Sequence, residues 1–232
     1  MIKSFGLLHK RDDISQKKFH AHWKNPHADH ALKLVPVLRR YVQNHKAAKP
    51  YPGMKPPCDG APEVWLSSME ASATLTTMPE YLDGAYMDEP QFMKVRSGGV
   101  LVSEQVIVEG DPIGKKEKLV KVLYFLKRNP ALNAEQFREQ WMAHDGPLFV
   151  NQDNVRRYVK SPTLPETFVD GNATFDGVEE LWWNSDAAFK RDKKGGANKA
   201  DLALLLDLDG SRAMFVDENR VFWPGIADDE DA

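Results

Sequence analysis

The stretch "RRYV" occurs twice in the chain, at residues 39–42 and again at residues 156–159. Other segments repeat around it in the same order. "DGAPEVW" (59–65) corresponds to "DGVEELW" (176–182), and "LVSEQVIV" (101–108) corresponds to "FVDENRVF" (215–222). Upstream, "KSFGLLHK" (3–10) corresponds to "KVLYFLKR" (121–128). An ordered series of matches across both halves indicates an internal duplication.

The start of a helix is duplicated as well. Ser15 and Asn133 have side-chain oxygens that can cap a first helical turn, and each follows an aliphatic residue. The spacing of the aromatic residues after each cap predicts a helix with one face toward the core. The residues on that face are Phe19, Trp23 and His27 in the first copy and Phe137, Trp141 and His144 in the second.

Each copy reads as strand, helix, strand, strand, helix, strand, with the second helical region near residues 78–94 and 185–207. This order is the ferredoxin-like βαββαβ unit. Both parities of strand 121–128 are apolar, which is typical of a strand buried on both faces. We therefore predict an α+β fold in which two tandem ferredoxin-like units pack sheet to sheet within one chain. The predicted divisions are 1–112 for the first unit, 113–118 for a linker, 119–225 for the second unit and 226–232 for an acidic tail.

Composition limits the classes of function. The 232 residues are 42% hydrophobic and 28% charged with a net charge of -3, as in an ordinary globular protein. Basic residues lie in mixed-sign surroundings, so nucleic acid is not an expected partner. The one cysteine, Cys58, cannot form an internal disulfide, and neither a signal peptide nor a membrane-length apolar run is evident. We expect a cytoplasmic protein without a membrane partner.

The run Phe-x3-Trp-x3-His, followed by "LRRYVQNH" and "DGAPEVW", resembles the EthD family of the dimeric α/β-barrel superfamily. Here two tandem copies stand in place of two subunits, which implies an intrachain dimeric α/β barrel. The superfamily includes cofactor-free cyclases, isomerases, decarboxylases and dehydratases, together with haem-binding relatives. The resemblance implies a small-molecule pocket bordered by the end of the first helix and the second strand. Fold membership alone does not settle the reaction.

The first copy holds most of the candidate chemistry. Six of the seven histidines lie within the first 45 residues, and Pro162 stands in the second copy where the first has His45. We expect the first copy to carry the working pocket and the second to support it. The proline-containing loop of residues 46–60 is expected to form a stiff rim.

Three residues are the candidate catalytic groups. His27 continues the helical face of Phe19 and Trp23, and it matches the helix-end histidine of the family. Tyr41 and His45 share one face of the second strand by the period of two. An imidazole opposite a phenol and a second imidazole suits general acid–base catalysis. The candidate substrate-binding residues are Trp23, His22, His30, Arg40, Trp65, Tyr158 and His144.

Other interpretations of these histidines stay open. His27, His45 and His144 can be structural imidazoles bonded to backbone carbonyls, and His22 and His30 can be surface residues in solvent. A zinc site is the sharper alternative, because His22, His27 and His30 with Asp29 supply suitable ligand types, although their spacing matches no compact motif. Haem has no Cys-x-x-Cys-His attachment motif, and neither a phosphate-binding glycine loop nor a serine-hydrolase elbow is present. We predict no bound metal.

These features together favour a cofactor-independent lyase or isomerase. The expected chemistry is proton transfer, such as C–C cleavage, decarboxylation, dehydration or cyclisation, on a small hydrophobic and aromatic catabolic intermediate. His27 would be the acid or base, while Tyr41 and His45 would orient the substrate or stabilise oxyanion charge. The alternatives are a non-catalytic small-molecule-binding protein and a metal- or haem-dependent oxidative enzyme. A homodimer beyond the intrachain pseudo-dimer is also compatible with this interpretation.

Overall fold

The computed structural model describes residues 2–34, 37–94, 101–104, 106–169 and 174–224. The chain divides into two compact units that are not contiguous in sequence. The first unit contains Met1–Lys46, Cys58–Val102 and Glu218–Ala232, and the second contains Ala47–Pro57 and Ser103–Asp217.

The sheet of the first unit is antiparallel where its pairing is described. Its strands are β1 (Ile2–Phe5), β2 (Leu38–Lys46), β3 (Gly60–Leu66) and the start of β4 (Leu101–Glu104). β3 lies between β1 and β2, with Leu66 opposite Ile2 on one side and Val64 opposite Tyr41 on the other. The central strand therefore fixes the register of the strand that carries Tyr41.

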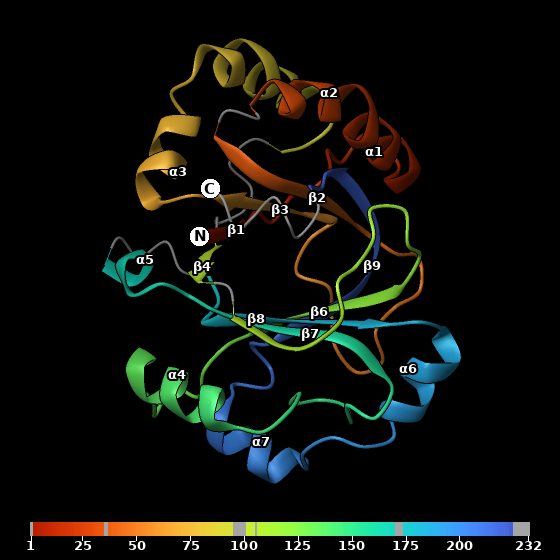
Figure 1. Cartoon of the computed structure of the whole chain (residues 1–232), viewed down its shortest axis with the longest axis vertical. Helices are drawn as coiled ribbons and strands as arrows, with labels where there is room; N and C mark the ends of the chain where they lie inside the picture. The colour runs from red at the N-terminus through yellow and green to blue at the C-terminus, as the bar shows by residue number, and fades with distance from the viewer. Residues whose placement is uncertain (1, 35–36, 95–100, 105, 170–173, 225–232) are drawn as a thin grey trace. The chain divides into compact units, whose positions relative to one another are not determined.

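The helices of the first unit lie on one face of this sheet (Figure 1). In chain order they are α1 (Gln16–His22), the π-helical turn η1 (Trp23–His27), α2 (Ala28–Ala31), η2 (Leu32–Leu34), α3 (Met69–Leu75), η3 (Tyr81–Tyr86) and η4 (Glu89–Gln91). The predicted cap is confirmed, since the Ser15 side chain accepts from the Lys18 amide at 3.2 Å. Asn25 leaves the helical conformation (φ -163°, ψ 122°), so the chain starts a new turn at Pro26 and carries His27 onward.

The second unit repeats the same order of elements. Its strands are β5 (Val106–Gly110), β6 (Val120–Leu126), β7 (Val155–Pro162), β8 (Gly177–Trp183) and β9 (Arg212–Phe222), the last of which continues into the first unit from Glu218. Its helices are α4 (Ala134–Ala143), α5 (Pro165–Val169), α6 (Asp186–Asp192) and α7 (Lys199–Leu205). Asn133 and Gln136 form a complete capping box at the start of α4, as the duplicated cap predicts. α5 was not predicted.

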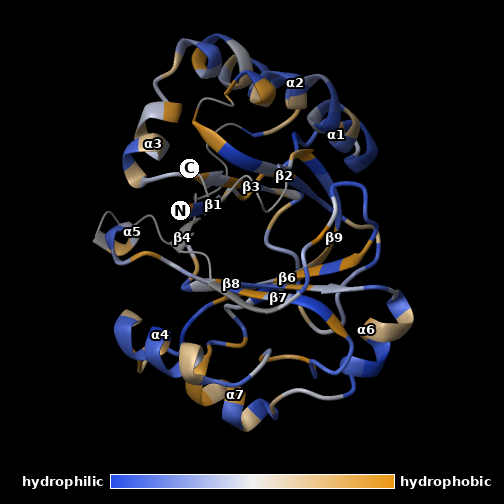
Figure 2. Ribbon diagram, in the orientation of Figure 1, coloured by the Kyte–Doolittle hydropathy of each residue, from blue (hydrophilic) through white to orange (hydrophobic). Residues whose placement is uncertain are grey.

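The core of the second unit explains the apolar strand 121–128. Residues 122–126 of β6 are all fully buried, so both faces of this strand are covered. β6 pairs with β8 and β9, and β7 pairs with β8 and β5, all antiparallel. Figure 2 shows apolar residues along these strands and polar residues over much of α1 and α4.

The sequence copies and the spatial units are different divisions of the chain. β5 belongs to the segment that the sequence assigns to the first copy, yet it pairs with β7 of the second unit. The loop 47–57 also belongs to the second unit, where the Ala47 amide donates to the Phe215 carbonyl at 2.9 Å and Tyr51 is buried. Strand β5 and the loop 47–57 therefore belong to the second unit, although the sequence places both in the first copy.

The repeated Asp-Gly pairs serve packing as well as turn formation. A Cβ atom on Gly60 would lie 2.4 Å from the ring of Trp23, and one on Gly177 would lie 2.3 Å from the ring of Trp141. No side chain larger than hydrogen fits at either place. The tryptophan of the first helix and the glycine of the third strand therefore form one packing unit that occurs twice.

Candidate active site

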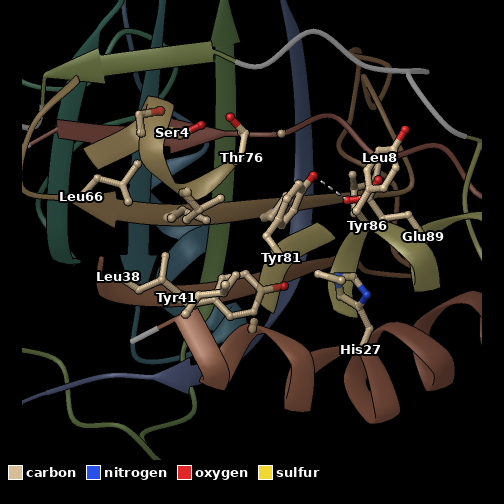
Figure 3. A pocket seen from close by; sticks show the side chains of 18 of the residues that line it. Ser4, Leu8, His27, Leu38, Tyr41, Leu66, Thr76, Tyr81, Tyr86 and Glu89 are labelled. Atoms are coloured by element: carbon tan, nitrogen blue, oxygen red, sulfur yellow. Dashed lines mark hydrogen bonds between the residues drawn. The ribbon is translucent and has the colours of Figure 1, made fainter. Parts of the chain in front are cut away.

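A cavity of about 370 Å³ lies within the first unit, between the sheet and its covering helices. Its walls are mostly apolar, and Figure 3 shows Leu38 and Leu66 toward one end with His27 and Glu89 toward the other. The lining residues are Ser4, Gly6, Leu7, Leu8, Trp23, His27, Ala31, Leu34, Leu38, Tyr41, Pro62, Val64, Leu66, Ser72, Leu75, Thr76, Tyr81, Ala85, Tyr86, Glu89 and Met93. This size and lining are typical of a small-molecule site.

His27 is held by a carboxylate that the sequence analysis did not select. Its Nδ1 lies 2.9 Å from Oδ2 of Asp88, and the His27 side chain is 10% exposed. Asp88 also accepts from Nε2 of His22 through its other oxygen, at 2.8 Å. The π-helical turn before His27 and the segment between η3 and η4 bring these groups together.

The protonation states follow from burial and hydrogen bonding. Burial lowers the pKa of His27 below its usual value, and the hydrogen bond to Asp88 offsets this only in part. Burial acts to raise the pKa of Asp88, but the bonds from His22 and His27 outweigh it and leave that pKa lowered. Asp88 is therefore a carboxylate that accepts the Nδ1 proton of a neutral His27. This tautomer, assigned from the hydrogen bond, leaves Nε2 with its lone pair free to accept a proton.

Tyr41 presents a hydroxyl proton to the cavity. Its oxygen accepts from Nε1 of Trp23 at 3.2 Å and from Nε2 of Gln43 at 3.3 Å. No described protein group accepts the proton of Tyr41 itself, so this donor is available to a ligand. Burial raises the pKa of Tyr41 to about 12, which keeps the phenol protonated at neutral pH.

The carboxyl group of Glu89 lines the cavity, whereas Asp88 is not among the lining residues. Oε1 of Glu89 accepts from the Tyr81 hydroxyl at 3.2 Å, the contact drawn in Figure 3. Burial raises the pKa of Glu89, while the Tyr81 hydrogen bond acts in the opposite direction. The cavity is thus lined by a base, by the three phenols of Tyr41, Tyr81 and Tyr86, and by a carboxyl group.

The structure places His45 away from this cavity, contrary to the expectation that it would face His27. Its Nε2 lies 3.2 Å from Oε1 of Gln43, and its ring packs on those of Trp23 and His20. Burial lowers the pKa of His45 to about 3, with His20 and Lys24 adding to the shift. The expected shared face with Tyr41 is present, but Gln43 and Trp23 fill the space between His45 and the cavity.

The candidate substrate-binding residues of the first unit divide into three groups. Trp23 lines the cavity. His22 and His30 lie behind its wall, where His22 bonds Asp88 and the His30 ring lies 6.4 Å from that of His27. Arg40 and Trp65 are buried against the ring of Trp223 and do not line the cavity.

The matching positions of the second unit are filled by a buried carboxyl group. Tyr158, the counterpart of Tyr41, donates to Oε1 of Glu179 at 2.6 Å, and Trp141 donates to the same oxygen at 2.9 Å. Glu179 occupies the place that Pro62 has in the first copy, where Pro62 lines the cavity. His144 lies beside a turn, with Nδ1 3.3 Å from the Gly146 carbonyl.

The loop 46–60 does not form the expected rim, because none of its residues is among those that line the cavity. The lining residues instead include Tyr81, Ala85 and Tyr86 of η3 and Glu89 of η4. Asp88, Glu89 and Tyr81 were missed by the sequence analysis. The available signal was the acidic pair before Pro90, which is weak because adjacent acidic residues are usually solvated.

The ligand set considered for zinc is not assembled. Within the described residues, no group of three or more histidine, cysteine, aspartate or glutamate side chains could hold a metal ion. The carboxylate that contacts both His22 and His27 is that of Asp88, whereas the zinc hypothesis used Asp29. Among the helices of the described part of the chain, none has the length and apolar character needed to cross a membrane.

Comparisons with known proteins agree with this architecture. Residues 11–95 match the family model described as EthD domain, which confirms the predicted resemblance in the first copy. No curated protein matches the chain closely enough to count as a relative.

Solved structures extend the likeness to both units. A candidate monooxygenase from Fusobacterium nucleatum is 11% identical with a TM-score of 0.59, covering 97% of this chain and 94% of that chain. An anthrone oxidase-like protein is also 11% identical, with a TM-score of 0.55 and coverages of 95% and 93%. A chlorite dismutase variant from Candidatus Nitrospira defluvii is 7% identical with a TM-score of 0.50, covering 93% and 91%. At such identities the likeness concerns the fold alone, and it confirms the predicted class of two ferredoxin-like units.

Proposed function

We propose that the EthD domain of residues 11–95, with the strands that complete its sheet, forms an active site for cofactor-independent proton transfer. The substrate is a small, mostly apolar and aromatic molecule, and the reaction is that of an isomerase or lyase. The observation that carries the proposal is the hydrogen bond between Asp88 and His27, whose side chain lines a cavity of about 370 Å³. A neutral imidazole with an oriented free nitrogen is a suitable general base near neutral pH.

The chemistry follows from the groups at the polar end. Nε2 of His27 removes a proton from a carbon next to a carbonyl group of the ligand. The C–H bond breaks, its electron pair moves toward the carbonyl oxygen, and the Tyr41 hydroxyl donates a hydrogen bond to the oxygen that gains charge. Imidazolium then returns the proton to another atom in an isomerisation, or to a departing group in an elimination. Asp88 stabilises the imidazolium through Nδ1.

The division of roles differs from the one expected from sequence. His45 takes no part in this proposal, because its ring is separated from the cavity by Gln43 and Trp23. Asp88 takes the place of a second catalytic residue as the group that orients His27. A role in catabolism, a cytoplasmic location and a further homodimer belong to the same proposal.

A non-catalytic binding protein is the main alternative. A metal- or haem-dependent oxidative enzyme is the other, and two of the similar structures carry descriptions of oxidising proteins. Removal of a proton also makes an electron-rich aromatic ligand easier to oxidise by molecular oxygen. The test must therefore measure proton removal and oxygen consumption separately.

The experiment is a screen of hydroxylated aromatic compounds and cyclic aromatic ketones against metal-stripped protein in deuterium oxide. Proton NMR reports the exchange of carbon-bound hydrogen, and an oxygen electrode reports oxidation. We expect exchange that depends on His27 without added cofactor, with the His144→Ala variant as the matched control. Exchange that persists in His27→Ala, or turnover that appears only after addition of metal or haem, would overturn the proposal.

A further inference from the structure

We propose that Glu89 makes the cavity selective for ligands that present an O–H or N–H donor and carry no negative charge. The inference rests on the proposed function only in using the same cavity, and it concerns binding rather than turnover. Its subject is the class of ligand that the polar end accepts.

The charge balance of the cavity wall is the first argument. Among the described lining residues Glu89 is the only carboxyl group and His27 the only imidazole, and the lining includes neither lysine nor arginine. No described cation pairs with Glu89, whose single protein donor is the Tyr81 hydroxyl at 3.2 Å. The wall therefore offers an anionic ligand no cation of its own.

The hydrogen-bond balance is the second argument. A carboxylate accepts through two oxygens, and only Oε1 of Glu89 has a donor among the described residues. Burial and the neighbouring Asp88 both raise the pKa of Glu89, and only the Tyr81 hydrogen bond acts in the opposite direction. A ligand hydroxyl or amide N–H that reaches Oε2 would hydrogen-bond an acceptor that has no donor among the described residues, and hydrogen bonds to charged groups contribute more than those between neutral groups.

Repulsion gives the expected size of the effect. A ligand carboxylate at the polar end would lie close to Glu89 in a partly buried site, where two like charges interact more strongly than in water. We expect such a ligand to bind about 100-fold more weakly than a neutral analogue of equal shape. The opposite end, lined by Leu34, Leu38 and Leu66, suits an apolar ring system.

Three 2-substituted naphthalenes separate the effect of ligand charge on binding from the effect of ligand size. 2-Naphthol and 2-naphthamide are neutral donors, whereas 2-naphthoate is the carboxylate analogue of the amide at about pH 7.5. Isothermal titration calorimetry gives the dissociation constant of each for the full chain. The variants are Glu89→Gln, which removes the charge with little change of shape, and Glu70→Gln at an exposed site in the first turn of α3 as the matched control.

The native protein is expected to bind both neutral probes and to discriminate against 2-naphthoate by about 100-fold. Glu89→Gln should reduce this discrimination at least about tenfold, while Glu70→Gln leaves it unchanged. Equal binding of 2-naphthoate and 2-naphthamide, unchanged discrimination in Glu89→Gln, or failure of both neutral probes to bind would each overturn the inference. The same titrations with His27→Ala show whether selectivity survives when the proposed base is absent, which keeps this inference distinct from the proposed reaction.

Discussion

The indole nitrogen of Trp23 donates a hydrogen bond to the phenol oxygen of Tyr41 across 3.2 Å, within the wall of the cavity. The corresponding tryptophan of the second unit, Trp141, donates to Glu179 instead. The first arrangement leaves a phenol proton available to a ligand. The second uses the equivalent phenol of Tyr158 to satisfy a buried carboxyl group. One substitution at a duplicated position, Pro62 against Glu179, thus distinguishes a lined cavity from a filled core.

Replacement of the proposed base should slow the reaction strongly. We expect His27→Ala to lower the rate by about 10²–10⁴-fold, as is typical for loss of a general acid or base. Asp88→Asn should slow it at least about tenfold, because an amide neither stabilises imidazolium nor fixes the tautomer as well. Steady-state rates on a substrate from the exchange screen provide the measurement. His144→Ala is the control, and equal losses in His27→Ala and His144→Ala would contradict the assignment.

The two matched tyrosines should separate activity from stability. Tyr41→Phe removes the donor to the developing oxyanion, and we expect a fall in kcat of about 10²–10³-fold. Tyr158→Phe removes a donor to buried Glu179 and should lower the free energy of unfolding by about 1–3 kcal/mol with kcat unchanged. Urea unfolding and kinetics on both variants test this. A fully folded Tyr158→Phe variant with a reduced kcat would refute the assignment of activity to Tyr41 and of stability to Tyr158.

The pH dependence of the rate should report His27. The base must be neutral, and burial lowers its pKa, so the rate should stay constant down to about pH 6.5 and fall only at lower pH. Asp88 raises the pKa of His27, and therefore Asp88→Asn should move this acid limb to still lower pH. The profile of kcat/KM against pH for both proteins is the measurement. A limb that moves upward in Asp88→Asn would show that another group titrates.

His45 should make the fold sensitive to acid. Its pKa is about 3 in the folded protein, against about 6.5 when unfolded, so the unfolded state binds the proton first as the pH falls. The stability contributed by neutral His45 is complete above about pH 6.5 and decreases by about 1.4 kcal/mol per pH unit below it. Between about pH 6.5 and 5 the native protein should lose about 2 kcal/mol more than His45→Gln does. Denaturant unfolding at both values tests it, and parallel losses in the two proteins would exclude His45 as the cause.

The glycines beneath the two tryptophans should tolerate no side chain. Gly60→Ala and Gly177→Ala each place a Cβ atom within 2.4 Å of an indole ring, and we expect each to destabilise the fold by about 1–3 kcal/mol. Gly60→Ala should also alter ligand binding, because Trp23 lines the cavity, whereas Gly177→Ala should not. Gly114→Ala is the control, since its nearest neighbour lies at 3.9 Å. Thermal unfolding measures the loss of stability, and calorimetry measures ligand binding. A Gly60→Ala variant that binds the ligand normally would contradict the packing argument.

Local signals in the sequence were sufficient for the duplicated elements. The caps at Ser15 and Asn133, the aromatic face of each first helix and the doubly apolar strand β6 depend on neighbours within a few residues, or on burial that the pattern itself reveals. The same signals indicated that His27 and Tyr41 face a common space, because helix and strand periodicity fix the direction of their side chains. The order βαββαβ followed from these elements.

The partners of the site were decided by tertiary structure. Asp88 lies 61 residues from His27 in the chain and 2.9 Å from it in space, and no local pattern specifies that contact. His45 has the expected strand parity, yet the side chains of Trp23 and Gln43 lie between it and the cavity. Strand parity gives the direction of a side chain and not the size of the side chains packed in front of it. The assignment of β5 and of residues 47–57 to the second unit likewise depends on hydrogen bonds between distant segments. Sequence alone thus determined the repeated local structure and the positions of His27 and Tyr41, whereas long-range packing decided that Asp88 meets His27 and that Tyr41 lines a cavity while its counterpart Tyr158 bonds a buried carboxyl group.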